Sequence, residues 1–168
     1  MANVKISELA ELTTPAADDK MVIVDASEAL DADKTKYITV SNLRAGPTFL
    51  TTPLTSTAWD GDSHSTTPRT LIDLSSVFGA PAGIKAVLLY VRAKDSASSS
   101  SNCYIGFSPN DTADSWALVN KPYDQANDTV RHVQGIVPCD ANGDVYYQIV
   151  ASGTKTFVVN LEIWGYWL

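Results

Sequence analysis

The stretch IKAVLLYVRAK, residues 84–94, decides the fold class that this sequence predicts. Val87, Leu89 and Val91 alternate along it with a second set of apolar residues that includes Tyr90. Because successive side chains of a β-strand point to opposite faces of its sheet, the stretch predicts a strand that is apolar on both faces. Such a strand needs cover on both sides, which favours a central position in a layered β-protein.

Short runs of the same kind fill the chain beyond residue 59, and clusters of turn residues separate them. No stretch of ten residues there has the period of an amphipathic helix. The other predicted strands are TLIDL (70–74), NCYIGFS (102–108), TVRHVQGIV (129–137), DVYYQIV (144–150) and KTFVVNLEIWGYWL (155–168). The pattern is typical of an antiparallel all-β domain, and we predict a jelly-roll-like β-sandwich over residues 59–168.

Some of these runs carry more detailed predictions. In the run 102–108, Cys103, Ile105 and Phe107 alternate inward. The pair Asn142-Gly143 is a strong signal for a tight hairpin. In the last run one predicted face holds Phe157, Val159, Leu161, Ile163 and Trp167, and the opposite face holds Val158, Asn160, Glu162, Trp164 and Tyr166.

Composition and charge argue against several classes of partner. The chain has 168 residues, of which 45% are hydrophobic and 18% charged, so it is long enough to bury a substantial core. The net charge is −7 and the twelve lysines and arginines are scattered singly, which argues against a nucleic-acid partner. Glu8 and Glu11 interrupt the apolar residues near the start, so we expect a soluble, unprocessed chain without membrane insertion.

The chain divides by composition into three parts. Residues 1–45 hold two short apolar clusters and are too few to build a core of their own. Residues 46–58, GPTFLTTPLTSTA, are rich in threonine, and Pro47 and Pro53 disfavour helix and remove two backbone donors. We therefore predict an N-terminal segment (1–45), an extended Thr/Pro linker (46–58) and a sandwich (59–168).

Signals for catalysis or metal binding are weak. Asp60, Asp62 and His64 alternate in WDGDSHS and would project to one side as metal ligands, but a solvated loop is the preferred interpretation. The stretch DANGD (140–144) lacks the glycine and glutamate that a calcium loop requires later in its sequence, so it is interpreted as a turn. We predict no bound metal and no cofactor.

No serine, cysteine or histidine stands in a recognisable catalytic signature, and His132 lies within a predicted strand. A pair of carboxylates at glycosidase separation stays open, because any two of the nineteen acidic residues could meet in the fold. The expectation is that the chain is not an enzyme. Cys103 and Cys139 are expected to be reduced and packed, with a disulfide between adjacent strands as the alternative.

Aromatic residues are the better functional clue, because flat amphipathic rings stack on sugars or fill interfaces between subunits. The alternative is that most of them belong to the core. The candidates for contact with a glycan are Trp59, Trp116 and Tyr123. The candidates for contact between subunits are Trp164, Tyr166 and Trp167.

The N-terminal segment resembles the leader of many tailed-bacteriophage fibre, spike and head-fibre proteins. The resemblance covers about the first quarter of the chain, KISELAELTTPAADDKMVIVDASEALDADKTKYITVSNL (5–43). Its elements are Ile6 and Leu9, a threonine pair, Asp18 and Asp19, a short apolar strand, a polar turn and a second strand with Lys36, Ile38, Thr39 and Leu43. The C-terminal part also resembles small β-sandwich modules of phage virion proteins.

The resemblance implies a homotrimer that the N-terminal segment binds to a capsid or tail protein, with the distal domain facing solvent and often a host surface. The residues assigned to docking are Ile6, Leu9, Leu12, Met21, Val22, Ile23 and Val24. The chain has no long triple-stranded shaft and no repetitive β-helix body, which favours a short fibre, spike or capsid-decorating protein without depolymerase activity. The alternative hypothesis is a carbohydrate-binding module that recognises host surface sugar.

Overall fold

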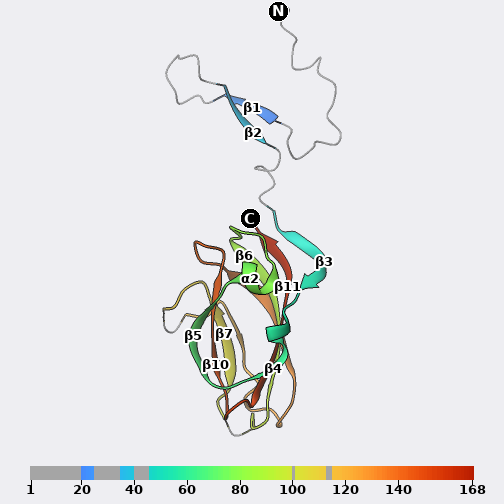
Figure 1. Ribbon diagram of the computed structural model, residues 1–168, viewed down its shortest axis with the longest axis vertical. Helices are drawn as coiled ribbons and strands as arrows, with labels where there is room; N and C mark the ends of the chain where they lie inside the picture. Colours follow the sequence, from blue (N-terminus) through green and yellow to red (C-terminus); the bar gives the residue numbers. More distant parts are fainter. Residues whose placement is uncertain (1–19, 25–34, 40–45, 100, 113–114) are drawn as a thin grey trace, which may run out of the picture. The chain divides into compact units, whose positions relative to one another are not determined.

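The computed structural model describes residues 20–24, 35–39, 46–99, 101–112 and 115–168 (Figure 1). The chain forms two compact units, Met1–Ala45 and Gly46–Leu168. In the part of the chain that the structure describes, no helix is long and apolar enough to cross a membrane.

In the first unit, β1 (Lys20–Val24) pairs antiparallel with β2 (Thr35–Thr39). Lys20 lies opposite Thr39, and Val24 lies opposite Thr35. β1 is the short apolar strand that the sequence predicts after Asp18 and Asp19, and it contains Met21–Val24. The docking residues Ile6, Leu9 and Leu12 lie outside the described residues.

The second unit consists of two antiparallel sheets packed together, as the sequence predicts (Figure 1). The five-stranded sheet contains β3 (Thr48–Leu54), β4 (Asp60–His64), β6 (Ala86–Asp95), β9 (Arg131–Pro138) and β11 (Phe157–Trp167). The four-stranded sheet contains β5 (Thr67–Ile72), β7 (Tyr104–Ser108), β8 (Leu118–Asn120) and β10 (Val145–Val150). The all-β sandwich fold is thus confirmed.

Strand β11 organises the five-stranded sheet. One of its edges pairs with β6 along nearly its whole length, and β6 pairs in turn with β9. Its other edge is shared, because β4 pairs with residues 157–160 and β3 pairs with residues 163–166. In the second sheet the order is β5, β10, β7, β8.

The segment 46–58 corrects the linker prediction. Its backbone is extended, but Thr48–Leu54 forms β3 and belongs to the sandwich, which begins at Gly46. Leu54 also packs against the hydrophobic core. Pro47 lies before β3, and Pro53 is tolerated within it because β3 is an edge strand, where a missing donor breaks no second ladder.

The core lies between the two sheets and follows the predicted alternation. Val87, Leu89 and Val91 of β6 are fully buried or nearly so, as are Ile105 and Phe107 of β7. The opposite face of β6 differs from the prediction, because Leu88 and Tyr90 are half-buried and Arg92 is exposed. This face therefore lies on the outside of the sandwich, with no second layer over it among the described residues.

Two short helical turns were not predicted. The 3-10 turn η2 (Thr57–Trp59) leads into β4, and helix α2 (Leu74–Phe78) connects the two sheets. Asp73 caps α2 by accepting a hydrogen bond from the Ser76 N–H at 2.9 Å. Gly79 ends the helix in the left-handed region at φ 71°, which a residue with a Cβ rarely adopts.

The turn 140–144 is confirmed, but it is not a hairpin turn. It joins β9 of one sheet to β10 of the other, so the strands on either side are not paired. The Asp140 carboxylate accepts hydrogen bonds from the N–H groups of Asn142 and Asp144 at 2.8 and 2.9 Å. These side-chain bonds satisfy the backbone of the turn.

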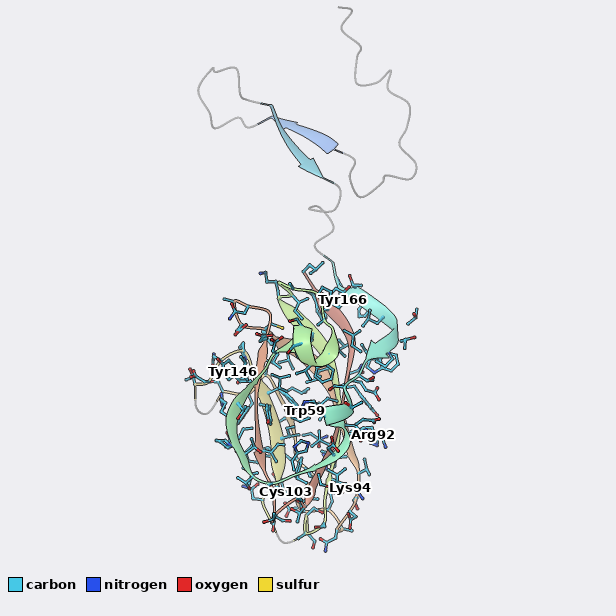
Figure 2. All side chains as sticks on the ribbon, in the orientation of Figure 1. Trp59, Arg92, Lys94, Cys103, Tyr146 and Tyr166 are labelled. Atoms are coloured by element: carbon cyan, nitrogen blue, oxygen red, sulfur yellow. The ribbon has the colours of Figure 1, made fainter. Side chains whose placement is uncertain are left out.

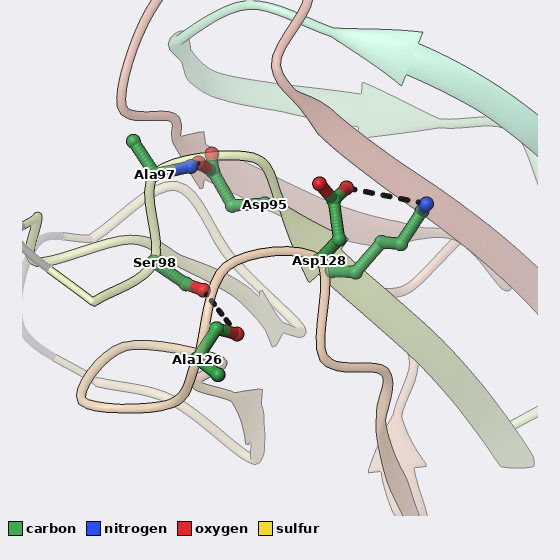
Figure 3. A network of polar contacts seen from close by, with 6 residues as sticks. Asp95, Ala97, Ser98, Ala126 and Asp128 are labelled. Carbon is green, nitrogen blue, oxygen red and sulfur yellow. Dashed lines mark hydrogen bonds and ion pairs between the residues drawn. The ribbon is translucent and has the colours of Figure 1, made fainter.

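A polar cluster ties together the loops at one end of the sandwich (Figure 3). The buried Asp95 carboxylate accepts hydrogen bonds from Ala97 N–H, Ser152 N–H, Ser152 Oγ and Thr156 Oγ1. Burial opposes ionisation, but these hydrogen bonds outweigh it and lower the pKa of the Asp95 carboxyl. Nearby, Lys94 and Asp128 form a solvent-exposed ion pair at 3.3 Å.

Candidate functional site

The end of β11 carries a bulge that sets the positions of the C-terminal aromatic residues. The pairing with β6 shifts between Ile163 and Gly165, so Trp164 is the extra residue. A bulge changes which residues face outward beyond it. Tyr166 packs against the core, and Trp167 lies opposite Ala86 on the outer face. The faces predicted for Tyr166 and Trp167 are therefore wrong, whereas Trp164 lies on the outer face as predicted.

Exposed and half-buried apolar side chains lie on the outer face of the five-stranded sheet, toward the end of β11. The Phe49 side chain is 65% exposed and meets the Trp167 ring edge-on, with the ring centroids 6.5 Å apart. Ile136 is 54% exposed and lies opposite Leu88 in the β6–β9 pairing. We call these four residues the aromatic end: Phe49, Leu88, Ile136 and Trp167.

Next to the aromatic end is a groove lined by side chains from three strands, which we call the Arg92 groove. Its volume is about 450 Å³. Figure 2 labels Arg92 beside the five-stranded sheet. The lining residues are Tyr90 and Arg92 of β6, His132 of β9, and Glu162 and Trp164 of β11.

Strand pairing brings the groove residues together. Tyr90 lies opposite Glu162, and Arg92 lies opposite His132. The Tyr90 hydroxyl is 2.6 Å from His132 Nδ1, and Trp164 Nε1 donates a hydrogen bond to Glu162 Oε2 at 2.8 Å. Two aromatic rings are therefore held in place by polar partners beside a guanidinium group.

Trp59 does not have the exposed position that contact with a glycan requires. Its side chain is only 6% exposed and belongs to the core between the sheets (Figure 2). The ring stacks on His64 and meets Tyr147 edge-on, both at 4.9 Å between centroids. The prediction that Trp59 contacts a glycan is thus wrong.

Trp116 is half-buried, and its ring is already engaged. It covers Gly106 of β7 so closely that a Cβ at this glycine would lie 2.5 Å from the ring. The Arg69 guanidinium lies over the ring at 4.0 Å, and Tyr104 meets it edge-on. These contacts leave less of the Trp116 ring available for a sugar than the sequence prediction assumed.

Tyr123, one of the three glycan candidates, lines an open hollow. This hollow has a volume of about 480 Å³ and is lined by Tyr123, Ser99, Ser101, Asn102 and Asp124. The loops that form it are cross-linked, because Ser98 Oγ donates to Ala126 O at 3.1 Å (Figure 3). Trp59, which is buried in the core, therefore does not share a surface with Tyr123.

The residues Asp60, Asp62 and His64 lie in β4, not in a loop. Asp60 accepts a hydrogen bond from Asn160 Nδ2 at 2.8 Å, and His64 stacks on Trp59. Burial lowers the pKa of His64, and the charge of Asp62 opposes this shift. Among the described residues, no group of three histidine, cysteine or acidic side chains is placed to hold a metal ion.

Both cysteines are free. Burial, with a smaller contribution from the charge of Asp95, raises the pKa of the Cys103 thiol to about 11. Burial, with the charges of Asp140 and Asp144, raises the pKa of the Cys139 thiol to about 12. Because the thiolate is the reactive form, neither residue has the character of a catalytic cysteine at neutral pH.

Sequence reasoning missed the Arg92 groove. The alternation in β6 identifies Tyr90 and Arg92 as residues of one face, but nothing in the sequence specifies the register that brings His132 and Glu162 beside them. The bulge at Trp164 also determines which side chains of β11 face the groove. The sequence signal for this bulge is Gly165. A Cβ at this glycine would lie 2.8 Å from the Thr48 carbonyl oxygen.

Comparison with known proteins identifies no family for this chain. No protein-family model matches it, and no curated protein matches its sequence significantly.

Proposed function

We propose that this chain is a structural protein of a bacteriophage virion, a short fibre, spike or capsid-decorating protein. The N-terminal segment docks on a capsid or tail protein, and the sandwich is displayed as a knob. The observation that carries the proposal is the division of the chain at residue 45, with the hydrophobic core assigned to Gly46–Leu168. The likeness of residues 5–43 to phage leaders supports the docking role.

The physical basis of docking is that a two-stranded pair buries too little apolar surface to be stable alone. Met21–Val24 of β1 and the clusters at Ile6, Leu9 and Leu12 supply apolar residues for a partner surface. Ordering such a segment on a partner costs conformational entropy, which lowers the affinity of one attachment. Several copies in one oligomer would compensate through avidity.

The proposal includes a homo-oligomer, with a trimer as the expected state. The aromatic end supports a contact between copies, because Phe49 and Ile136 are exposed apolar side chains. The Phe49 ring meets Trp167, and Ile136 lies opposite Leu88. Trp167 is the central residue of this proposed contact, and Tyr166 supports it from the core side. Trp164, the third residue predicted for this contact, lies at its border with the Arg92 groove.

Light scattering tests this contact. The wild-type chain is expected to have three times the monomer mass, and the double variant Phe49→Ser, Ile136→Ser is expected to have the monomer mass. The variant Leu71→Ser is the matched control, because Leu71 is an exposed apolar residue of the other sheet. A monomeric wild-type chain would overturn the proposed oligomer.

The docking role is tested by comparing the full chain with residues 46–168 during particle assembly. We expect the shorter chain to stay folded and soluble but to be absent from purified virions. An unfolded 46–168 chain would mean that the N-terminal segment belongs to the core. Incorporation of the shorter chain would overturn the docking role.

A second candidate function is recognition of a host-surface glycan. The hollow beside Tyr123 favours it, because an aromatic ring there is accompanied by hydroxyl, amide and carboxylate groups of Ser99, Asn102 and Asp124. Binding on a glycan array that is lost in Tyr123→Ala and kept in Trp59→Phe would support this function. If the chain binds no glycan on the array, the glycan-recognition function is ruled out, and the proposed structural role is unaffected.

We propose no catalytic activity. Incubation of the full chain with host polysaccharide is expected to give no release of reducing ends. Turnover that is lost on replacement of Asp60, Asp62 or His64 would contradict this expectation.

A further inference from the structure

The Arg92 groove has the shape of an extended binding surface. It continues past Arg92 into a smaller hollow of about 70 Å³ that is lined by residues from β6, β11 and the segment before β9. Arg92 lines both hollows. The surface follows β6, from Trp164 at one end to Lys94 and Val130 at the other.

The groove holds two opposite charges that do not neutralise each other. No hydrogen bond or ion pair joins the Arg92 guanidinium group to a side chain or backbone group in the described part of the chain. Glu162 uses Oε2 to accept from Trp164 Nε1, and nothing among the described residues bonds to Oε1. An exposed guanidinium group offers a fork of donors that matches a carboxylate, and a free carboxylate oxygen accepts from hydroxyl groups.

The aromatic groups are pre-oriented. The hydrogen bond to Glu162 restricts the Trp164 indole, and the contact of 2.6 Å with His132 restricts the Tyr90 ring. Binding to groups that are already ordered loses less conformational entropy. Aromatic faces pack against the C–H surface of a pyranose ring while the hydroxyl groups around that ring reach polar neighbours.

We propose that the Arg92 groove binds an anionic saccharide. A pyranose ring packs against Trp164 and Tyr90, its carboxylate pairs with the Arg92 guanidinium, and its hydroxyl groups donate to Glu162 Oε1. The site is separate from the Tyr123 hollow, because the two share no lining residue. A second copy of the chain fits the groove less well, because the exposed apolar residues lie beyond Trp164 at the aromatic end.

The test uses the full chain and two pairs of probes that differ in charge. One pair is trigalacturonic acid and its methyl ester, and the other is sialyllactose and lactose. Titration calorimetry and saturation-transfer NMR measure binding at low salt. We expect at least one acidic probe to bind at least about tenfold more tightly than its uncharged partner, and added salt to reduce that preference.

Four variants assign the binding to the groove. Arg92→Gln is expected to remove the preference for the acidic probe, and Trp164→Ala is expected to abolish binding. Tyr123→Ala is the control, since it alters the other hollow and is expected to bind like the wild type. Circular dichroism checks that each variant is folded, and Trp164→Phe, which keeps an aromatic face, is expected to retain part of the affinity.

Other outcomes overturn the proposal. These are a failure of both acidic probes to bind, equal binding of a charged probe and its uncharged partner, or loss of binding in Tyr123→Ala but not in Arg92→Gln. If Trp164→Ala lowers the oligomeric mass while the wild type ignores every probe, the groove is a contact between copies. The proposed virion role is measured separately, by incorporation of the chain into particles, so the saccharide-binding result does not decide it.

Discussion

Gly106 has no side chain, so the ring of Trp116, a predicted glycan-binding residue, can lie directly against β7. The Trp116 ring occupies the space that a side chain at position 106 would fill, and Arg69 lies over the same ring. The alternation of β7 identifies the residues on either side of Gly106 as core residues. It does not reveal that a distant tryptophan covers the glycine, because that contact depends on the loop before β8.

Gly106→Ala is expected to destabilise the sandwich, since the new methyl group would lie 2.5 Å from the Trp116 ring. The cost should be about 1–3 kcal/mol, as for other overpacked sites, measured by urea unfolding. In the background Trp116→Ala the same change should cost much less. Gly46→Ala is the control, because nothing lies within 4 Å of a Cβ there. Equal costs in both backgrounds would contradict this contact.

His64 makes stability depend on pH. Burial lowers the pKa of its imidazole from the usual 6.5, and Nε2 is buried without a hydrogen-bond partner among the described residues. The unfolded chain therefore binds a proton at His64 more readily than the folded chain does. The free energy of unfolding should fall as the pH decreases below 6.5.

His64→Phe should keep the stack on Trp59 and remove this part of the pH dependence. Urea unfolding between about pH 8 and pH 5 measures it. His132→Phe is the comparison, since His132 is exposed on the outer face. A wild-type slope that persists unchanged in His64→Phe would rule out His64 as its source.

At the scale of elements, the predictable strands are those with strong alternation. Strands β6, β7, β10 and the first part of β11 were predictable because their inner residues repeat every second position over a buried face. β3 and β4 were not, because β3 is an edge strand with a proline and β4 has only polar residues and one glycine. Helix α2 is too short for its sequence to show a helical hydrophobic period, although cap residues stand at both ends, Asp73 before it and Gly79 after it.

The functional surface was less predictable than the fold. The sequence indicated that the C-terminal aromatic residues matter, and Trp164 and Trp167 do lie on an outer face. The partners of Trp164 come from β6 and β9, and only the register of three strands brings them beside it. Register depends on bulges and loop geometry, which alternation alone does not determine.

The role of β3 leads to a test by truncation. Residues 46–168 should unfold at the same urea concentration as the sandwich in the full chain. Residues 56–168 lack β3 but keep η2, so they expose the edge of β11 and lose the packing of Leu54. We expect a loss of about 2 kcal/mol or more, with self-association through the open edge. Identical stability of the two chains would restore the linker interpretation of 46–58.

The Asp95 cluster connects the ends of three strands, because its carboxylate binds Ser152 and Thr156 between β10 and β11. Asp95→Ala should cost about 2–4 kcal/mol, since it leaves several buried donors without an acceptor. Asp128→Asn breaks only the exposed ion pair with Lys94 and should cost under about 1 kcal/mol. Chemical denaturation compares the two variants, and equal effects would contradict a structural role for Asp95.

At the scale of the whole molecule, the two units have different physical characters. Gly46–Leu168 has a buried core between two sheets, whereas the described part of Met1–Ala45 is one pair of short strands. A partner surface would supply what the N-terminal segment cannot bury by itself. The proposed function depends on this difference: residues 1–45 dock on a partner, and residues 46–168 fold by themselves.

The proposed virion role can be tested by cryo-electron microscopy of particles purified from cells that produce this chain. We expect the sandwich to form an outward knob, present in several copies, with residues 1–45 in contact with a head or tail protein. Particles without the chain would rule out the virion role. Particles that hold the chain by the sandwich, while residues 1–45 contact nothing, would rule out the docking role.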